Sequence, residues 1–455
     1  MSGVSLCVAA LLITYLIAQR SFVNGLLAVI TVGYFYGILR ANFFVTSSYF
    51  IFDAAVLGFY FASFKELSAA FMTAGGQRLK HWVVFLMLVP LVLFFVPVQD
   101  PLVQLVGLRG HAFLLPFMLA GARLKREDFY RIGIWLAFLN LVAFAIGTAE
   151  YLFGLERFFP YNAVTDLIYR SNDVGAANDY RIPSTFANAH SFAGTMVLTV
   201  PLLAGAWVQK HLKTWHKNLV VAGLLATILG VFMSAARMHF LALAILLTIA
   251  TLSTRLRPIY RISWIMVLLL VGYVVSTHER MQRFTTLGDR HFVEGRLQAS
   301  VNTTLLDAMM DYPFGNGLGG GGTSLPFFLI DRVNMPVAIE SEWGRIVLET
   351  GLIGLASWAG FLLWVFTRPP ANRRDPAFLG WRLAWVVALT FFATGFIGIG
   401  LFTSIPSTTI LLMLVGWVST HHTGEADQPI LAHQHAVVGA QRPLILPQTG
   451  VASRG

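Results

Sequence analysis

Three arginines between positions 181 and 296 stand beside small or polar residues near the ends of apolar runs. Arg181 precedes an Ile-Pro-Ser-Thr stretch, and Arg237 lies in the short break 233–239 between two apolar runs. Arg296 lies at the start of an expected helix over 294–310. A guanidinium group binds phosphate or carboxylate through two parallel hydrogen bonds. These arginines therefore predict contacts to an anion. Bonds to backbone carbonyls for Arg181, and to lipid phosphates for Arg237, are the alternatives.

Acidic side chains gather at 339–354, where a long polar segment meets the next apolar run. Glu340 falls at the expected start of a helix, where the helix dipole favours an anion. A carboxylate near several arginines can accept a proton from a sugar hydroxyl, so Glu340 is the candidate general base. The alternative is that it only caps the helix. Glu342 and Arg345 have the spacing of a pair on a helix surface and are candidates for acceptor binding or support.

A helix and a glycine-rich loop precede that acidic cluster. Apolar residues at 297, 301, 305 and 309 follow an i, i+4 pattern, which predicts a helix packed on the apolar spans. The glycine-rich stretch 313–322 lacks the Lys-Ser/Thr ending of a nucleotide P-loop. Its backbone N–H groups are candidates for binding an anion, and a flexible loop is the alternative.

The composition indicates which class of protein positions these side chains. Of 455 residues, 56% are hydrophobic and 12% are charged, whereas an average soluble domain carries about 25% charged residues. This excludes a soluble globular enzyme, a disordered protein and an ordinary nucleic-acid binder. Long continuous apolar runs indicate an all-α polytopic membrane protein, because a β-barrel would show short alternating segments. The single cysteine, Cys7, excludes an intramolecular disulfide and a thiolate metal cluster.

Apolar stretches of about 20 residues predict about 12–13 transmembrane helices. We place them at about 4–18, 22–39, 43–63, 82–98, 108–122, 129–150, 191–208, 218–234, 237–253, 259–276, 342–366, 382–400 and 404–420. The stretch 108–122 contains Arg109 and His111 and is a candidate re-entrant segment. The first stretch lacks the basic region and cleavage site of a signal peptide, so we expect a span there.

Basic residues orient the expected helices. All lysines lie in clusters that share one side of the membrane and are therefore predicted to be cytoplasmic: 65–80, 123–131, 210–217, 255–261 and 368–382. The expected transmembrane domain, 1–420, then has two long periplasmic segments, 151–190 and 277–341. The remaining tail, 421–455, is rich in Pro, Gly, Gln and His and is predicted to be disordered and cytoplasmic.

The side predicted to be periplasmic carries arginine but no lysine. Its arginines are Arg109, Arg157, Arg170, Arg181, Arg237, Arg280, Arg283, Arg290, Arg296, Arg332 and Arg345. The positive-inside rule does not account for them. Either they recognise phosphate or carboxylate, or they pair with acids such as Glu156, Asp166, Asp289, Glu294 and Asp331. For Asp53, within an expected span, structural and functional roles are both open.

Five short motifs follow one another between positions 181 and 354. An Arg-x-x-Ser-Thr-Phe-x-Asn segment starts at Arg181, and a Ser-x-x-Arg break ends at Arg237. A Gly-Arg pair at Arg296, a Pro-Phe-Gly-x-Gly-x-Gly loop, and a Glu-x-Gly-Leu-Ile-Gly motif from Glu349 follow. In this order, the motifs resemble those of the bacterial O-antigen ligase and polymerase family of membrane glycosyltransferases, which are of the GT-C type. The resemblance covers roughly 180–360.

The resemblance implies a multi-pass protein of the bacterial inner membrane, with its active site facing the periplasm and its C-terminus in the cytoplasm. Such enzymes move glycan from an undecaprenyl diphosphate carrier to an acceptor hydroxyl, with no nucleotide sugar, metal or other cofactor. Arg237 and Arg296 match family arginines that contact the diphosphate, and Arg181 is a weaker match. Arg109 is a further candidate for acceptor binding or support. A chain-length regulator is a further expected partner, and nucleic acid is not.

One departure from the family favours a polymerase over a ligase. Family ligases carry a histidine where this chain has Glu340, nine residues before Glu349. We therefore expect polymerisation of lipid-linked oligosaccharide units into the O-antigen of lipopolysaccharide or into exopolysaccharide. Ligation to lipid A core or protein is the alternative. A lipid-linked glycan transporter or flippase is the alternative from another class, although the chain lacks the internal repeats typical of a transporter.

Overall fold

A computed structural model gives the structure of the chain. It describes residues 3–69, 71, 73–170, 180–209, 212–253, 289–322, 325–337, 339–367 and 378–420, without the side chains of 292, 293, 296 and 302–304. Within these ranges every regular element is a helix. The expected span 259–276, the expected tail 421–455 and the first part of the segment 277–341 lie outside the described residues.

Among the described residues, eight helices are long and apolar enough to cross a membrane. They are α1 (Gly3–Arg20), α2 (Phe22–Asn42), α5 (Ala74–Leu93), the pair α6 (Pro101–Ala112) and α7 (Pro116–Arg123), α8 (Arg126–Phe153), α10 (Ala189–Trp207), α11 (Thr214–Ser234) and α16 (Glu342–Phe366). Shorter apolar helices join them: α12 (Arg237–Ser253), α17 (Leu379–Thr394) and α18 (Ser407–Thr420). The all-α class, with many apolar helices of membrane-spanning length, is confirmed.

Two expected spans in the first third of the chain are interrupted. The expected span 43–63 divides into the 3-10 helix η1 (Thr46–Phe50) and α3 (Ile51–Ala62), with α4 (Phe64–Ser68) following. The expected span 108–122 starts earlier, at α6, where Asp100 caps the helix by accepting a hydrogen bond from the Leu102 N–H at 2.9 Å. The helix breaks before α7 because Pro116 has no backbone N–H with which to continue it.

A third expected span, 382–400, is shorter than predicted. Helix α17 ends at Thr394, and a loop over 395–406 leads to α18. Gly400 has φ 104, a left-handed conformation that other residues rarely adopt. The apolar residues of this loop are typical of a membrane span, which is why the sequence predicted a longer helix. Its glycines end the helix and form a turn instead.

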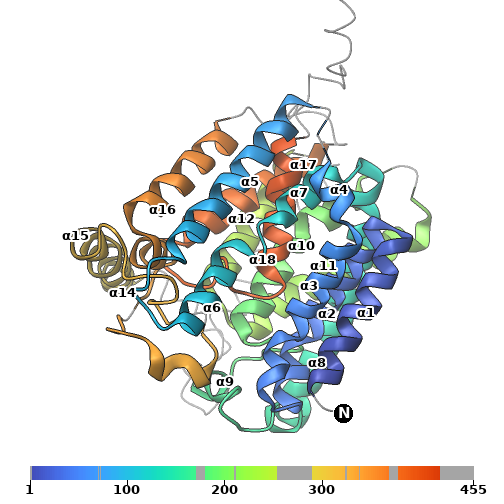
Figure 1. Cartoon of the computed structure of the whole chain (residues 1–455). Helices are drawn as coiled ribbons and strands as arrows, with labels where there is room; N and C mark the ends of the chain where they lie inside the picture. Colours follow the sequence, from blue (N-terminus) through green and yellow to red (C-terminus); the bar gives the residue numbers. More distant parts are fainter. Residues whose placement is uncertain are drawn as a thin grey trace, which may run out of the picture.

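Helix α10 lies at the centre of the bundle, and nearly all of its residues are buried (Figure 1). It packs against α8, α11, α12, α17 and α18. A buried amide ties these helices together: Asn140 of α8 accepts a hydrogen bond from Tyr34 of α2 at 2.6 Å. The same amide donates to Thr199 of α10 and Thr227 of α11, both at 2.8 Å. Buried polar groups satisfied in this way fix the register between helices.

Helices α7 and α18 approach each other through glycine. A Cβ atom on Gly121 would overlap the carbonyl oxygen of Met413, and one on Gly416 would overlap that of Met118. Small residues let helix backbones approach closely in membrane proteins, where packing rather than water exclusion drives association. This crossing joins the broken α6–α7 pair to the helix that follows the 395–406 loop.

The helix expected over 294–310 is present but is not a continuous α-helix. It consists of α14 (Arg290–Leu297), the π-helix η4 (Gln298–Leu306) and α15 (Asp307–Asp311). A π-helix takes an extra residue per turn, so the expected stripe 297, 301, 305 and 309 is buried only in part. Ser300, Leu305 and Ala308 are buried, while Leu297 is exposed. The segment packs on α16, as expected for a loop helix that rests on the spans.

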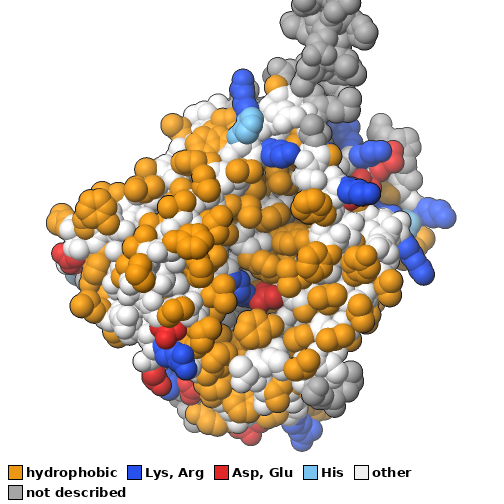
Figure 2. Space-filling model, in the orientation of Figure 1, with side chains coloured by type: hydrophobic (Ala, Val, Ile, Leu, Met, Phe, Trp, Pro, Cys, Tyr) orange, Lys and Arg blue, Asp and Glu red, His pale blue; other side chains and the backbone are white. Residues whose placement is uncertain are grey.

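Hydrophobic side chains cover most of one face of the molecule, and lysine and arginine gather along one edge of it (Figure 2). Large apolar side chains with wide exposure include Phe61, Phe64, Phe95 and Leu363. In water such a surface would drive aggregation, whereas in a bilayer it faces lipid.

Candidate functional site

A cavity of about 1290 Å³ gathers most of the polar residues singled out in the sequence. Its lining combines five arginines and no lysine with three carboxylates: Arg40, Arg109, Arg170, Arg181, Arg237, Asp53, Asp166 and Glu340. These side chains come from α2, α3, α6, α9 (Asp166–Arg170), α12 and two connecting segments. The candidate residues Arg109, Arg181, Arg237 and Glu340 therefore share one cavity, although the sequence separates the first from the last by 231 positions.

One wall of the cavity is built where chain segments enter α10 and α12. Asn188 caps α10 by accepting a hydrogen bond from the Ser191 N–H at 2.8 Å. Arg181 is buried, and its Nη1 donates to Nε2 of His190 at 3.0 Å. Because a guanidinium only donates, the acceptor Nε2 of His190 carries no proton in this contact. Arg237 begins α12 directly after a turn in which Ala235 is left-handed, with φ 50.

Arg109 is held in place by Asp53. The guanidinium donates two hydrogen bonds to the carboxylate, from Nε and from Nη2, each 2.7 Å long. The Asp53 side chain is largely buried, in the first turn of α3. This explains an acid within an apolar stretch: Asp53 balances the charge of Arg109 and fixes its direction. Both residues still line the cavity.

Glu340 lies just outside α16 and does not cap it. Ser341 is the N-cap, because its Oγ accepts a hydrogen bond from the Gly344 N–H at 2.9 Å. The alternative role of Glu340 as a helix cap is therefore wrong. Its half-buried side chain lines the cavity.

Glu342 and Arg345 form the expected pair, but the pair is buried rather than on a helix surface. Arg345 donates from Nη2 and Nε to Oε1 of Glu342, at 2.6 and 2.9 Å. Its Nη1 donates to Oε2 of Glu349 at 3.1 Å, and His111 of α6 contacts the same oxygen at 2.8 Å. Arg345 and Glu342 are fully buried and are not among the residues that line the cavity. They lie beneath the cavity wall rather than on its surface.

This buried cluster holds the wall of the cavity formed by the 395–406 loop. Oε2 of Glu342 accepts hydrogen bonds from the N–H groups of Gly400, at 2.7 Å, and Leu401, at 3.2 Å. The Glu342 N–H in turn donates to the carbonyl of Gly395 at 2.9 Å. Gly395, Gly400 and Leu401 all line the cavity. A charged pair within α16 thus fixes the loop between α17 and α18.

The glycine-rich loop 313–322 is part of this scaffold rather than an open cradle for an anion. Its N–H groups at Gly315, Gly320 and Gly322 donate to carbonyl groups of its own turns, at 2.9, 3.0 and 3.0 Å. The loop packs so tightly that a Cβ atom on Gly107 of α6 would overlap the backbone at Gly319. Gly322 is its contribution to the cavity lining.

Pairing with nearby acids, the alternative role for the arginines predicted to be periplasmic, is confirmed for several of them. Arg170 pairs with Asp166 at 2.7 Å, and Arg290 pairs with Glu294 at 2.6 Å; both arginines are mostly exposed. Arg332, at the end of the 3-10 helix η5 (Phe327–Arg332), lies 3.7 Å from Asp100. The backbone of Arg296 belongs to α14, but its side chain lies outside the described residues.

The described part of the segment 151–190, which is predicted to be periplasmic, is folded onto the bundle. After the 3-10 helix η2 (Leu155–Arg157), Leu155, Phe159 and Ile168 form a small core of their own. Tyr169 donates a hydrogen bond to the carbonyl of Phe159, and burial raises the pKa of Tyr169 to about 12. The phenol therefore keeps its proton at neutral pH. This core positions α9 at the cavity.

Sequence reasoning missed several side chains in and behind the cavity. Arg40 lies between the rings of Tyr36 and Tyr49, 5.3 and 4.9 Å from their centroids. Arg40 follows the expected second span, 22–39. The predicted topology puts the end of that span on the periplasmic side, so Arg40 belonged with the arginines predicted to be there. His190 and His239 line the same cavity, with their rings 6.1 Å apart. Within the described part of the chain, no three His, Cys, Asp or Glu side chains gather as a metal site would require.

Comparison with known protein-family models and with curated proteins finds no match to this chain.

Proposed function

We propose that this protein is a glycosyltransferase that polymerises undecaprenyl-diphosphate-linked oligosaccharide units into O-antigen or exopolysaccharide. The reaction takes place at the periplasmic face of the bacterial inner membrane. The observation that carries the proposal is the single cavity of about 1290 Å³ in which Arg237, Arg181 and Arg109 accompany Glu340. Five lining arginines without a lysine suit a doubly charged diphosphate, which a planar guanidinium binds with two bonds.

The chemistry assigned to these residues is a displacement at the anomeric carbon of the growing glycan. The bond between that carbon and the diphosphate oxygen of the carrier breaks, and its electron pair leaves with the lipid diphosphate. A hydroxyl of the next lipid-linked unit forms the new bond to the same carbon, and its proton passes to the Glu340 carboxylate. Arg237 and Arg181 stabilise the negative charge that grows on the diphosphate in the transition state.

We assign the role of general base in this cavity to Glu340. The acids Asp53 and Asp166 each accept a short bond from an arginine, Arg109 and Arg170 respectively, and so serve to hold these arginines in place. Glu340 extends from the segment before α16, and the neighbouring Ser341 performs the capping that it would otherwise provide. Its contribution is expected to be that of a positioned general base.

Deletion of the gene in its own host tests the proposal against its two alternatives. The surface glycan is separated by gel electrophoresis and the lipid-linked precursors are extracted. Loss of a polymerase leaves single repeat units at the surface. Loss of a ligase leaves long chains on undecaprenyl diphosphate, and loss of a flippase leaves precursors on the cytoplasmic face. Long chains or trapped precursors would contradict the proposal.

A further inference from the structure

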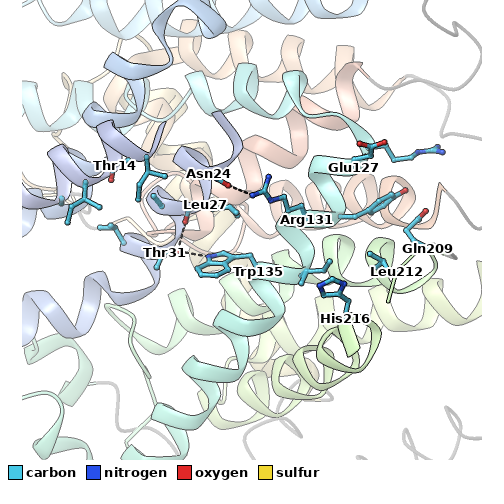
Figure 3. Close-up of a pocket in the computed structure, with 18 residues that line it drawn as sticks. Thr14, Asn24, Leu27, Thr31, Glu127, Arg131, Trp135, Gln209, Leu212 and His216 are labelled. Atoms are coloured by element: carbon cyan, nitrogen blue, oxygen red, sulfur yellow. Dashed lines mark hydrogen bonds between the residues drawn. The ribbon is translucent and has the colours of Figure 1, made fainter. Parts of the chain in front are cut away.

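A second large cavity lies between α1, α2, α8 and α11 (Figure 3). It is a groove of about 1150 Å³ at the opposite end of the helices from the arginine-lined cavity. Helix α2 shows this arrangement, because its residues 24–32 line the groove whereas Tyr36 and Arg40 line the cavity. Helix α8 contributes its first turns, Arg126 to Trp135, to the groove. Nothing in the proposed glycosyl transfer uses this site.

The walls of the groove are apolar along most of their length. The apolar lining comes from three helices. It includes Ile13 and Ile17 of α1, Leu27 and Val32 of α2, and Ile134 of α8. Two polar side chains in this part are paired: Trp135 donates to Thr31 at 3.0 Å, and Thr31 donates to the Leu27 carbonyl at 2.7 Å. The hydroxyl of Thr14 is buried without a hydrogen-bond partner among the described residues. Drug-sized ligands occupy about 300–1,000 Å³. The groove is larger and mostly apolar, which suits long hydrocarbon chains.

One end of the groove is polar and carries positive charge. Arg131 is exposed, and its Nη2 donates to Asn24 at 2.8 Å. Arg126 lies over the ring of Phe378, 4.6 Å from its centroid. Nδ1 of His216 is buried without a hydrogen-bond partner among the described residues. Figure 3 shows Arg131 and Trp135 entering the groove from α8, with His216 close by from the first turn of α11.

The local charge is positive beyond the lining itself. Lys125 precedes α8, and Lys213 and Lys217 stand at the start of α11. The acid that lines this end of the groove is Glu127, which is exposed. Basic side chains at the membrane surface attract anionic headgroups. Charge and shape therefore point to the same class of ligand, an amphiphile with a negative head and apolar chains.

We propose that this groove binds an anionic glycerophospholipid. Its acyl chains lie along the wall formed by Ile13, Ile17 and Ile134, and its phosphate lies at Arg131. The guanidinium provides up to five N–H donors, of which the bond to Asn24 uses one. His216 supplies a further polar contact to the headgroup. The lipid fills the space between α1–α2 and α8–α11 on the side where the lysines gather.

Native mass spectrometry of the purified full chain tests this proposal with two lipids that share the same acyl chains. Phosphatidylglycerol is expected to bind more tightly than phosphatidylcholine. Arg131→Gln is expected to lower phosphatidylglycerol affinity about fivefold, because one basic group is lost at the membrane surface. Phosphatidylcholine affinity should fall less, because its choline cation offsets the charge of the phosphate that Arg131 contacts. Arg157→Gln, just beyond the other end of α8, is the matched control and should change neither.

Two further variants separate charge recognition from a structural role of Arg131. Asn24→Ala removes the contact between α2 and α8 but keeps the guanidinium, so selectivity for phosphatidylglycerol should persist. Ala28→Trp fills the apolar wall and should weaken both lipids. Equal binding of the two lipids, equal effects of Arg131→Gln and Arg157→Gln, or preferential binding of undecaprenyl phosphate over phosphatidylglycerol would each overturn the proposal.

Discussion

Arginine has two separate roles in this molecule, and access to the cavity distinguishes them. Arg237 and Arg181 line a cavity, where their donors can reach a ligand. Arg345 is fully buried and directs its donors at Glu342 and Glu349. A buried guanidinium requires acids around it, because an uncompensated charge in an apolar interior is costly. Arg345 is therefore a structural ion, and the glutamate pair exists to balance it.

Removal of the buried guanidinium should destabilise the fold strongly. Arg345→Ala leaves Glu342 and Glu349 without their partner and is expected to cost about 3–5 kcal/mol. Arg345→Lys keeps the charge but loses the planar fork, so its loss should be intermediate. Thermal unfolding in detergent, followed by the helical circular dichroism signal, measures both. Arg290→Ala removes an exposed i, i+4 pair, which is worth about 0–1 kcal/mol, and equal losses at the two sites would contradict this account.

At the scale of elements, breaks in helices create the site. The turn before α12, the segment before α16 and the loop between α17 and α18 each expose side chains or backbone to one cavity. Each break is stabilised by local bonds, such as those from Glu342 to the loop at Gly400. The helices that carry these breaks are in turn fixed by close crossings. The crossing of α7 with α18 can be tested directly, because a residue larger than glycine at Gly121 or Gly416 would overlap the facing backbone.

A methyl group at that crossing should be disruptive. Gly416→Ala places a Cβ atom against the carbonyl of Met118, so the helices must separate or shift. Overpacking of this kind costs about 1–3 kcal/mol. Gly295→Ala in α14 is the matched control, since a Cβ atom there meets open space. Thermal unfolding of the two variants in detergent should show a drop for Gly416→Ala alone, and an unchanged Gly416→Ala protein would mean that the crossing is looser than described.

The sequence predicts the long helices well and their interruptions poorly. An apolar run such as 342–366 matches α16 because about 20 apolar residues suit a membrane span. The loop over 395–406 was missed because its residues are mostly apolar. The π-helical register of η4 brought Ser300 and Ala308 into the buried face and left Leu297 exposed. The spacing of apolar residues along the sequence indicates neither the loop after α17 nor the π-helical turns of η4.

The sequence indicated several residues that belong to the site, but not which of them contact one another. Arg181, Arg237 and Glu340 were recognisable as polar residues at the ends of apolar runs. The pairing of Arg109 with Asp53 was not, because 56 positions separate the two residues and only the packing of α6 on the α3 side of the bundle joins them. For Glu342 and Arg345 the spacing predicted a pair but carried no information on burial.

The whole molecule has opposite ends with different chemistry. The arginine cavity lies at one end of α2, and the apolar groove with its neighbouring lysines lies toward the other. From the positive-inside rule we expect the lysine end in the cytoplasm and the cavity at the periplasmic face. Lipid-linked oligosaccharide units would reach the cavity from that side.

Cysteine labelling checks this orientation in a Cys7→Ser background. Leu167 in α9 and Trp215 in α11 are both exposed and lie at opposite ends of the molecule. A membrane-impermeant thiol reagent should label the Leu167→Cys variant in cells with a permeable outer membrane. The Trp215→Cys variant should react only after the inner membrane is opened. The reverse pattern would place the cavity in the cytoplasm and rule out the proposed reaction.

Glycan elongation by the purified protein in proteoliposomes, supplied with lipid-linked oligosaccharide extracted from the deletion strain, tests the central claim most directly. The unmodified protein should produce a ladder of longer chains. Glu340→Gln should slow elongation about 10²–10⁴-fold through loss of the base, and Arg237→Ala about 10²–10³-fold through loss of transition-state stabilisation. The exposed neighbours Glu156→Gln and Arg157→Ala should elongate normally. Normal elongation by folded Glu340→Gln and Arg237→Ala proteins would contradict the assignment of this cavity as the active site.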